Sequence, residues 1–369
     1  MKFYWEDMIY QNTKEAINHL KASKRVVYVG TDPSAPYLHP GHSIIFAFLK
    51  SLQEEGHKII FLIGGITGII GDSAGKSQTR NMLDIEVVKK NTLTIIETIY
   101  ATLGDNVEII NNEEWLTTLQ LPQFLAEYCS KFSVNKILKN TTFAQRLSED
   151  ANLSLQEILY PVLQGIDFVT LYKNKNCTVQ IGGSDQWANI LAGINIKKDL
   201  HAITVQLLTN SQGKKLSKSD FDDISIHPNA NPWKVWQFFF NLNDISIGML
   251  AKFLRYEEPI SKEQRKRIAT DFTELHYGKK AAEAAKEQSY QIFQQKNLDY
   301  LPLKYAANNL SLCDLLTQIH LTTSKSNARK LIRDGAVKIN GVVAIDELAI
   351  VALPVKIMIN KNGVRVEKK

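Results

Sequence analysis

A histidine pair and a lysine-rich loop, far apart in the chain, are the residues best suited to bind a polyphosphate. The pair lies in His39-Pro-Gly-His42, directly before a segment with helical periodicity. Pro40 suits a first helical turn, because its fixed φ matches the helix and its missing N–H is not needed there. A helix N-terminus offers N–H groups and partial positive charge to phosphate, and the histidines could donate further hydrogen bonds. The motif alone leaves open that the histidines simply cap the helix.

The lysine-rich loop, residues 213–219, reads GKKLSKS and follows a predicted strand. Lys215 and Lys218 could neutralise the charge that develops as pyrophosphate leaves a nucleotide, and the Ser219 hydroxyl could donate to the same oxygens. On its own, such a loop is more often a solvated surface segment. Together with the histidine pair, it predicts a clamp on a polyphosphate.

A polar stripe on a third segment indicates a pocket for a small polar ligand. Ser154 and Glu157 have the spacing of a capping box, which begins a predicted helix. Tyr160, Gln164 and Asp167 follow on one face of that helix among apolar neighbours. Buried polar groups need partners, so a bound ligand would explain them. The alternative is a solvent-facing stripe on an amphipathic helix.

A fourth motif, residues 182–187 (GGSDQW), ends another predicted strand. Gly183 would allow close approach of a ligand to the backbone, and Asp185 could accept hydrogen bonds from ribose hydroxyls. A tight turn without a ligand would explain the same residues.

Strand-like and helix-like segments alternate over residues 25–210, and they would bring these motifs together. The predicted strands are Arg25–Gly30, Lys58–Ile63, Val107–Ile110, Thr178–Ile181 and Ile203–Leu208. Helical periodicity covers residues 42–55 and 84–103, the latter between Asp84 as a cap and Gly104 as a stop. This pattern predicts an α/β fold, a Rossmann-like doubly wound parallel sheet with helices on both faces. Ligands of such sheets bind beyond the carboxyl ends of the strands.

Three domains are predicted along the chain. Residues 1–220 form the Rossmann-like catalytic domain, and residues 221–300 form a helical domain with a linker to about residue 309. Residues 310–369 form a small α+β domain with two helices and a hairpin at Asn340-Gly341. Residues 301–369 carry 11 Lys or Arg and 5 Asp or Glu, so they hold the whole formal net charge of +6. A basic module on a neutral body suggests a polyanionic partner, nucleic acid before membrane, although a solvated basic tail is the alternative.

The composition favours a folded, cytoplasmic protein. Hydrophobic residues make up 44% and charged residues 22% of the chain. No apolar run is long enough for a membrane helix, and the N-terminus lacks the apolar core of a signal peptide. The cysteines, Cys129, Cys177 and Cys313, are widely spaced and odd in number, so we expect reduced thiols.

Taken together, the motifs resemble the signatures of class I aminoacyl-tRNA synthetases. His39-Pro-Gly-His42 matches the first signature, usually written HIGH, and Lys215-Leu-Ser-Lys218-Ser219 matches the second, usually written KMSKS. The wider pattern resembles the bacterial tyrosyl-tRNA synthetases over nearly the whole chain. It consists of Tyr28-Val-Gly-Thr-Asp32-Pro-Ser, Ile70-Gly-Asp72, Tyr160-x3-Gln164-x2-Asp167 and Gly182-Gly-Ser-Asp-Gln186-Trp. The last 60 residues or so resemble the small RNA-binding fold that ends these enzymes.

The resemblance implies a role for each of these residues. Tyr28 and Asp167 would bind the phenolic hydroxyl of tyrosine. The ammonium and carboxylate groups of tyrosine would be held by Asp72, Tyr160, Gln164 and Gln186. The residues that would position ATP are Asp32, His39, His42, Gly183 and Asp185. Lys215, Lys218 and Ser219 would stabilise the transferring phosphates, and Lys76 and Arg80 could assist from a second mobile loop.

The function that the resemblance implies is that of a tyrosine–tRNA ligase. Such an enzyme activates L-tyrosine with ATP to tyrosyl-adenylate and pyrophosphate, then transfers tyrosine to the 3′ end of tRNA(Tyr). Mg²⁺ would accompany ATP without a tightly bound metal, and a homodimer is expected, with Leu121–Phe132 as a candidate interface. Two alternatives remain. A tryptophan-specific relative should lack the pair Tyr28 and Asp167, and a non-catalytic RNA-binding paralogue would not need the signature histidines and lysines.

Overall fold

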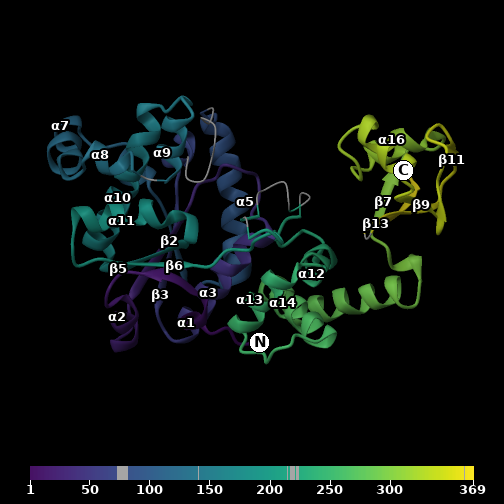
Figure 1. Cartoon of the computed structure of the whole chain (residues 1–369), viewed down its shortest axis with the longest axis horizontal. Helices are drawn as coiled ribbons and strands as arrows, with labels where there is room; N and C mark the ends of the chain where they lie inside the picture. Colours follow the sequence, from purple (N-terminus) through teal and green to yellow (C-terminus); the bar gives the residue numbers. More distant parts are fainter. Residues whose placement is uncertain (73–81, 140, 214, 217–220, 222–223, 361) are drawn as a thin grey trace. The chain divides into compact units, whose positions relative to one another are not determined.

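The computed structural model describes residues 1–72, 82–139, 141–213, 215–216, 221, 224–360 and 362–369 (Figure 1). They divide into two compact units, Met1–Ala282 and Glu283–Lys369. The division into three domains that we expect from the sequence stays a prediction.

A six-stranded sheet forms the centre of the first unit, with the strand order β1-β6-β5-β2-β3-β4. Its strands are β1 (Ile9–Asn12), β2 (Val26–Thr31), β3 (Lys58–Ile63), β4 (Val107–Asn111), β5 (Cys177–Gly183) and β6 (His201–Val205). All neighbouring pairs are parallel except β1 and β6, which are antiparallel. The predicted α/β class and parallel sheet are confirmed, and the carboxyl ends of β2 to β6 lie at one edge.

Helices cover both faces of this sheet (Figure 1). On one face, Phe168 of α10 (Leu155–Lys175) packs on Tyr28 of β2, with ring centroids 5.1 Å apart. On the other face, Phe46 of α3 (Ser43–Glu54) packs on Phe61 of β3 at 5.8 Å. The sheet is therefore buried on both sides, which explains why its strands are continuous apolar runs.

The local signals in the sequence set several helix ends. Helix α5 (Ile85–Leu103) begins where the Asp84 side chain accepts from the Glu86 N–H and ends at Gly104, which has φ 74°. The predicted strand over Ile203–Leu208 is displaced, since β6 starts at His201 and ends at Val205.

Helix α10 carries the polar stripe. It begins with both reciprocal bonds of the capping box between Ser154 and Glu157, and it continues through Pro161. The segment between β4 and α10 contains short helices: α6 (Glu113–Leu116), α7 (Leu121–Gln123), η2 (Phe124–Tyr128), η3 (Cys129–Lys131), α8 (Val134–Ile137) and α9 (Thr141–Ser148). Arg146 of α9 donates to Glu157 at 2.7 Å, and the two side chains are only 1% and 3% exposed. A buried ion pair therefore ties this segment to the start of α10.

The remaining elements of the first unit are mostly helical. They are α1 (Trp5–Met8), α2 (Ala16–Ala22), η1 (Pro40–His42), α4 (Thr67–Ile70), η4 (Ser184–Gln186), α11 (Trp187–Ile196), α12 (Pro232–Phe240), α13 (Asp244–Phe253) and the first part of α14 (Lys262–Phe293). Ser261 and Gln264 form the predicted capping box at the start of α14, and Gly278 interrupts its helical backbone. No helix in the described part of the chain is long and apolar enough to cross a membrane.

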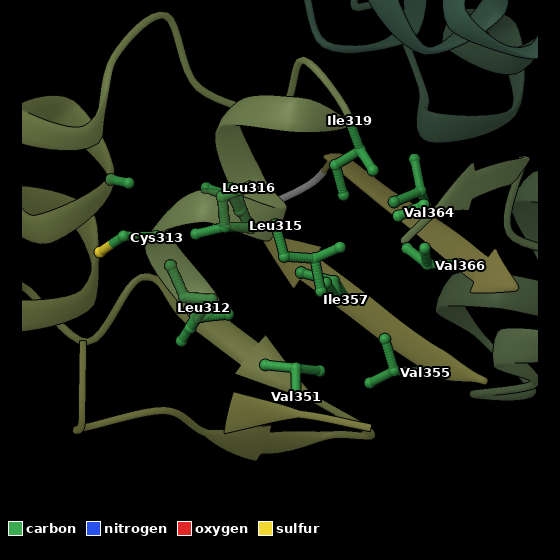
Figure 2. Packing of buried hydrophobic residues seen from close by; sticks show 14 of the residues in the cluster. Leu312, Cys313, Leu315, Leu316, Ile319, Val351, Val355, Ile357, Val364 and Val366 are labelled. Carbon is green, nitrogen blue, oxygen red and sulfur yellow. The ribbon is translucent and has the colours of Figure 1, made fainter. Parts of the chain in front are cut away.

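The second unit is a small α+β module. Its elements, after the end of α14, are η6 (Leu298–Tyr300), β7 (Leu303–Ala306), β8 (Leu310–Ser311), α15 (Leu312–Gln318), α16 (Lys325–Arg333), β9 (Val337–Ile339), β10 (Val342–Val343), β11 (Ile350–Val351), β12 (Val355–Ile359) and β13 (Asn362–Lys368). Figure 2 shows the leucines of α15 packed against Ile357 and the valines of the strands. Asn340 and Gly341 have φ of 49° and 88° between β9 and β10, so the predicted hairpin is confirmed.

Candidate active site

Side chains that follow the parallel strands meet at the carboxyl edge of the sheet. Asp32 follows β2, Thr67 follows β3 and Asn112 follows β4. The Thr67 hydroxyl donates to Asp32 Oδ1 at 2.8 Å, and Asn112 Nδ2 donates to the Thr67 hydroxyl at 3.0 Å. Polar side chains that follow three neighbouring strands are therefore hydrogen-bonded to one another at one edge of the sheet, and Asp32 is the one among them that the sequence singles out.

Asp167 of α10 joins this group as a buried carboxylate. It is 3% exposed and accepts from Asn112 Nδ2 at 3.1 Å and from Trp115 Nε1 at 2.8 Å. Burial raises the pKa of the Asp167 carboxyl to about 7, although the two hydrogen bonds oppose this effect. The carboxyl group is thus held in a fixed orientation and titrates close to neutrality.

Two buried polar atoms, on Tyr28 and on Gln180, have no hydrogen-bond partner in the part of the chain that the structure describes. The Tyr28 hydroxyl is fully buried and has no hydrogen bond to any residue that the structure describes. Gln180 of β5 is aligned with Tyr28 of β2 and so points to the same face of the sheet, and its Oε1 is likewise unpaired among the described residues. Burial, and then the charge of Asp167, hold the pKa of Tyr28 well above its usual value. Because native proteins rarely leave buried polar atoms unpaired, these two atoms indicate a polar ligand group.

The polar stripe of α10 extends this network in the other direction. The Tyr160 hydroxyl donates to Asp32 Oδ2 at 2.7 Å, and Tyr160 is buried like Asp167. The alternative of a solvent-facing stripe is therefore wrong for both residues. Gln164 lies between them on α10 and is partly buried. One chain of hydrogen bonds runs through Trp115, Asp167, Asn112, Thr67, Asp32 and Tyr160.

A second cluster forms around Asp72. Gln186 Nε2 donates to Asp72 Oδ2 at 2.7 Å, and Asn189 Nδ2 donates to Asp72 Oδ1 at 3.1 Å. Asp72 and Gln186, which are far apart in sequence, therefore come together as the resemblance implies. An anionic group held by two amides at a sheet edge is suited to bind a substrate cation.

The histidines of the first signature do cap the helix start. His39 Nδ1 accepts from the Gly41 N–H at 3.1 Å, and His42 Nδ1 accepts from the His39 N–H at 3.2 Å. Burial lowers the pKa of His42 to about 4, so its ring is neutral near pH 7. His42 Nδ1 also lies 3.1 Å from the His39 carbonyl oxygen, so its contacts fit either tautomer, and in the tautomer with the proton on Nε2 the ring can donate a hydrogen bond to a ligand. Capping and ligand binding are therefore compatible.

Phe221 packs directly on the first signature. Its ring stacks on His39 at 3.9 Å with an interplanar angle of 12°, and it contacts Phe238 of α12 at 5.3 Å. A Cβ on Gly41 would lie 2.7 Å from Phe221 Cζ, so only glycine fits between the two rings. Phe221 therefore links the first signature to α12 through ring contacts.

The second signature is described only in part. Lys215 Nζ forms an ion pair with Asp185 Oδ2 at 2.6 Å, beside the end of β5 and Gly183. The other predicted residues of the phosphate clamp, Lys218 and Ser219, and the predicted mobile-loop residues Lys76 and Arg80, lie outside the described residues.

Sequence reasoning missed several residues of this site: Thr67, Asn112, Trp115, Gln180 and Asn189. Thr67 and Asn112 follow predicted strands, so the rule that ligands bind at carboxyl ends could have indicated them. Gln180 is a polar residue inside an apolar strand, which is also a usable signal. Trp115 and Asn189 have no local signal, because only the fold brings them to the two carboxylates.

Comparisons with known proteins agree with this geometry. The model of the family "tRNA synthetases class I (W and Y)" matches residues 20–308. A tyrosine–tRNA ligase of Wolbachia sp. subsp. Brugia malayi is 35% identical over 344 residues, covering 85% of this chain and 82% of that relative. A tyrosine–tRNA ligase of Mycoplasma genitalium is 33% identical and covers 98% of this chain and 96% of the relative.

A solved structure shares the fold. The C-terminally truncated mitochondrial tyrosyl-tRNA synthetase of Aspergillus nidulans superposes with a TM-score of 0.66 at 23% identity, covering 79% of this chain and 95% of that chain. The matches with these two relatives extend over most of both chains, and the residues that the family model matches span both signatures and the polar site at the sheet edge. The chain therefore belongs to the class I tRNA synthetases of the tryptophan and tyrosine family.

Proposed function

We propose that this chain is a tyrosine–tRNA ligase. It activates L-tyrosine with ATP and transfers the tyrosyl group to the 3′ end of tRNA(Tyr). The observation that carries the choice of tyrosine is the buried hydroxyl of Tyr28, which lies close to the carboxyl group of Asp167 and has no hydrogen bond to any described residue. The curated relatives named above are tyrosine–tRNA ligases, which supports the same choice.

Tyr28 and Asp167 read the phenolic hydroxyl of the substrate. The phenol donates to the Asp167 carboxylate and accepts from the Tyr28 hydroxyl, so each group gains a partner. Phenylalanine leaves both groups buried and unpaired, and each such group costs about 1–3 kcal/mol. Tyrosyl-tRNA synthetase is itself the standard example of this asymmetry, with a discrimination of about 10⁵ against phenylalanine. Gln180 Oε1 lies on the same sheet face and lines this end of the pocket.

The polar groups of α10 and Asp72 hold the amino-acid end of tyrosine. Asp72, Tyr160 and Gln164 bind the ammonium group, and Gln186 orients the carboxylate. The bond from Gln186 to Asp72 and the bond from Tyr160 to Asp32 support this arrangement, because they place the donors and anions beside one another before the substrate arrives.

ATP binds beyond the ends of β2 and β5. Asp32, His39, His42, Gly183 and Asp185 position it, and Mg²⁺ enters with ATP as part of the substrate. The tyrosine carboxylate attacks the α-phosphate and pyrophosphate leaves, while Lys215, Lys218 and Ser219 stabilise the charge on the phosphates. Lys76 and Arg80 assist in that stabilisation. Lys215 must leave Asp185 for this role, since the ion pair at 2.6 Å occupies both groups.

The second unit binds tRNA through its basic surface, and the protein works as a cytoplasmic homodimer. Its charge supports tRNA binding, because residues 301–369 carry the entire net charge of +6. Leu121 and Leu125 support an interface over Leu121–Phe132, since they are 65% and 53% exposed in one chain.

Exchange of pyrophosphate into ATP tests the proposed function. We expect exchange with tyrosine, but none above background with tryptophan and very little with phenylalanine. Tryptophan-dependent exchange would assign the chain to the tryptophan enzymes, and absence of exchange with every amino acid would indicate a non-catalytic paralogue. Charging of tRNA(Tyr) transcript then tests the second step separately.

A further inference from the structure

A buried histidine outside the substrate site, His276 of α14, contacts the helix that begins at the first signature. His276 is 4% exposed. Its Nε2 lies 2.7 Å from the Ser43 hydroxyl, and its Nδ1 lies 2.9 Å from the Thr102 hydroxyl. Both ring nitrogens are therefore used, one as a donor and the other as an acceptor.

The two hydroxyls belong to different parts of the catalytic unit. Ser43 is the first residue of α3 and directly follows His42 of the first signature. Thr102 lies near the end of α5 and far from either signature in sequence. His276 thus joins α14 of the helical segment to the residue beside His42 and, independently, to α5.

The ring of His276 is neutral and confined. Burial lowers the pKa of His276 to about 3, and the nearby His42 lowers it further, so no charge appears at neutral pH. Phe46 of α3 approaches the ring edge-on at a centroid distance of 5.5 Å. An apolar side chain of similar size would fill the same space without a hydrogen-bonding requirement. Unlike such a side chain, the imidazole orients the hydroxyl groups of Ser43 and Thr102 through its two hydrogen bonds.

The orientation of the Ser43 side chain should affect the rate of ATP activation more than that of the Thr102 side chain does. His42 is the residue that directly precedes the first turn of α3, and in the proposed mechanism its ring must meet the phosphates. Misplacement of such a group by about 1 Å can cost about a hundredfold in rate. The Thr102 side chain is hydrogen-bonded to His276, which links two helices, and Thr102 is not adjacent in sequence to either signature. We propose that His276 is a positioning residue for ATP activation: its hydrogen bond to Ser43 sets the first turn of α3 and thereby the direction of His42.

Two amide substitutions separate the two contacts of His276. The amide nitrogen of glutamine can occupy the place of Nε2, so His276→Gln keeps the bond to Ser43. The amide nitrogen of asparagine can occupy the place of Nδ1, so His276→Asn keeps the bond to Thr102. Each variant loses one buried hydrogen bond, and we therefore expect similar losses of thermal stability from both.

The readout is tyrosine-dependent pyrophosphate exchange by the full chain. We expect His276→Asn to lower kcat by roughly tenfold to a hundredfold with the KM for tyrosine almost unchanged, and His276→Gln to stay near the unmodified rate. Thr273→Val is the matched control, because the buried Thr273 hydroxyl donates to the Ala269 carbonyl oxygen within the same helix, α14. It should lose stability without losing kcat.

Equal kcat values for the Asn and Gln variants would overturn the inference. Where neither variant folds, Ser43→Ala and Thr102→Val decide the matter, since only Ser43→Ala should lower kcat. An equal effect of these two would assign His276 a purely structural role. The inference rests on the proposed function, and different results of the experiment refute the inference and the proposed function. Absence of exchange in the unmodified protein refutes the proposed function, whereas normal exchange with indistinguishable variants refutes only the role of His276.

Discussion

The affinity for tyrosine should rise with pH around neutrality, because the Asp167 carboxyl has a pKa of about 7 in the free protein. The groups that surround its two oxygens, Asn112 Nδ2 and Trp115 Nε1, are both donors. Ionised Asp167 can accept a third hydrogen bond from the phenol, and this charge-assisted bond is stronger than any bond between the phenol and a neutral carboxyl group. Tyrosine should therefore bind the ionised form and release a proton wherever the carboxyl was protonated.

The size of the effect follows from that pKa. If only the ionised form binds, the apparent Kd exceeds its limiting value by about elevenfold near pH 6 and by about 1.1-fold near pH 8. We therefore expect affinity to improve by about tenfold over this range. His42 of the first signature does not titrate in this range, because its pKa is about 4.

The measurement is a titration of the protein with tyrosine, without ATP, in buffers from about pH 5.5 to about pH 8.5. Phenylalanine at high concentration is the control ligand, since it brings no phenol to Asp167, and its weaker affinity should be almost independent of pH. Asp167→Asn should lose the pH dependence together with most of the affinity for tyrosine. A Kd for tyrosine that stays constant over this range, or an equal slope for phenylalanine, would refute the proposed contact.

Three further predictions concern other parts of the chain. Arg146→Met should lower the free energy of unfolding by about 3–5 kcal/mol, because it leaves Glu157 charged and buried, and adding Glu157→Gln should recover most of that loss in urea titrations. Gly41→Ala should slow pyrophosphate exchange by roughly tenfold or more, since the new Cβ forces the Phe221 ring to move. Truncation after Gln295 should preserve exchange while impairing charging of tRNA, and the charging of tRNA by the full chain should weaken steeply with salt.

Each of these predictions has an outcome that contradicts it. The prediction for the ion pair of Arg146 and Glu157 fails if the double variant is no more stable than Arg146→Met. Gly248→Ala on α13 is the control for the glycine, because its Cβ would meet no atom closer than 3.5 Å, and equal rates for the two alanine variants would contradict the argument. Full charging by the truncated chain would exclude the second unit as a tRNA-binding module.

Local signals in the sequence predict those parts of the fold that local chemistry determines. Asp84 and Gly104 mark both ends of α5, and the hairpin forms at Asn340-Gly341, because side-chain caps and positive φ act over a few residues. The antiparallel edge strand β1 is not predicted. It has only four residues, and its partner, β6, lies almost two hundred residues further along the chain.

The residues of the candidate site also fall into two groups, those that the sequence can predict and those that only the folded structure brings together. Residues in compact motifs, such as His39 and Asp167, can be found from the sequence, because their neighbours carry part of the signal. Trp115 cannot, since its role as a donor to Asp167 exists only after the segment behind β4 folds against α10. The partner of Ser43 is equally hidden, because more than two hundred residues separate Ser43 from His276.

The hydrogen-bonded chain at the sheet edge has a consequence for changes in substrate specificity. It connects Asp167, to which we assign the phenol in the proposed function, with Tyr160, to which we assign the ammonium group. Each residue of the chain is hydrogen-bonded to the next. Mutations in it should therefore show strong epistasis. A variant that admits a bulkier amino acid by changing Asp167 should disturb the orientation of Asn112 and Thr67, and through them Asp32 and Tyr160 at the proposed ammonium site. Efficient variants with altered specificity should consequently carry compensating changes within this chain, and single substitutions at the phenol end should lose catalysis along with selectivity.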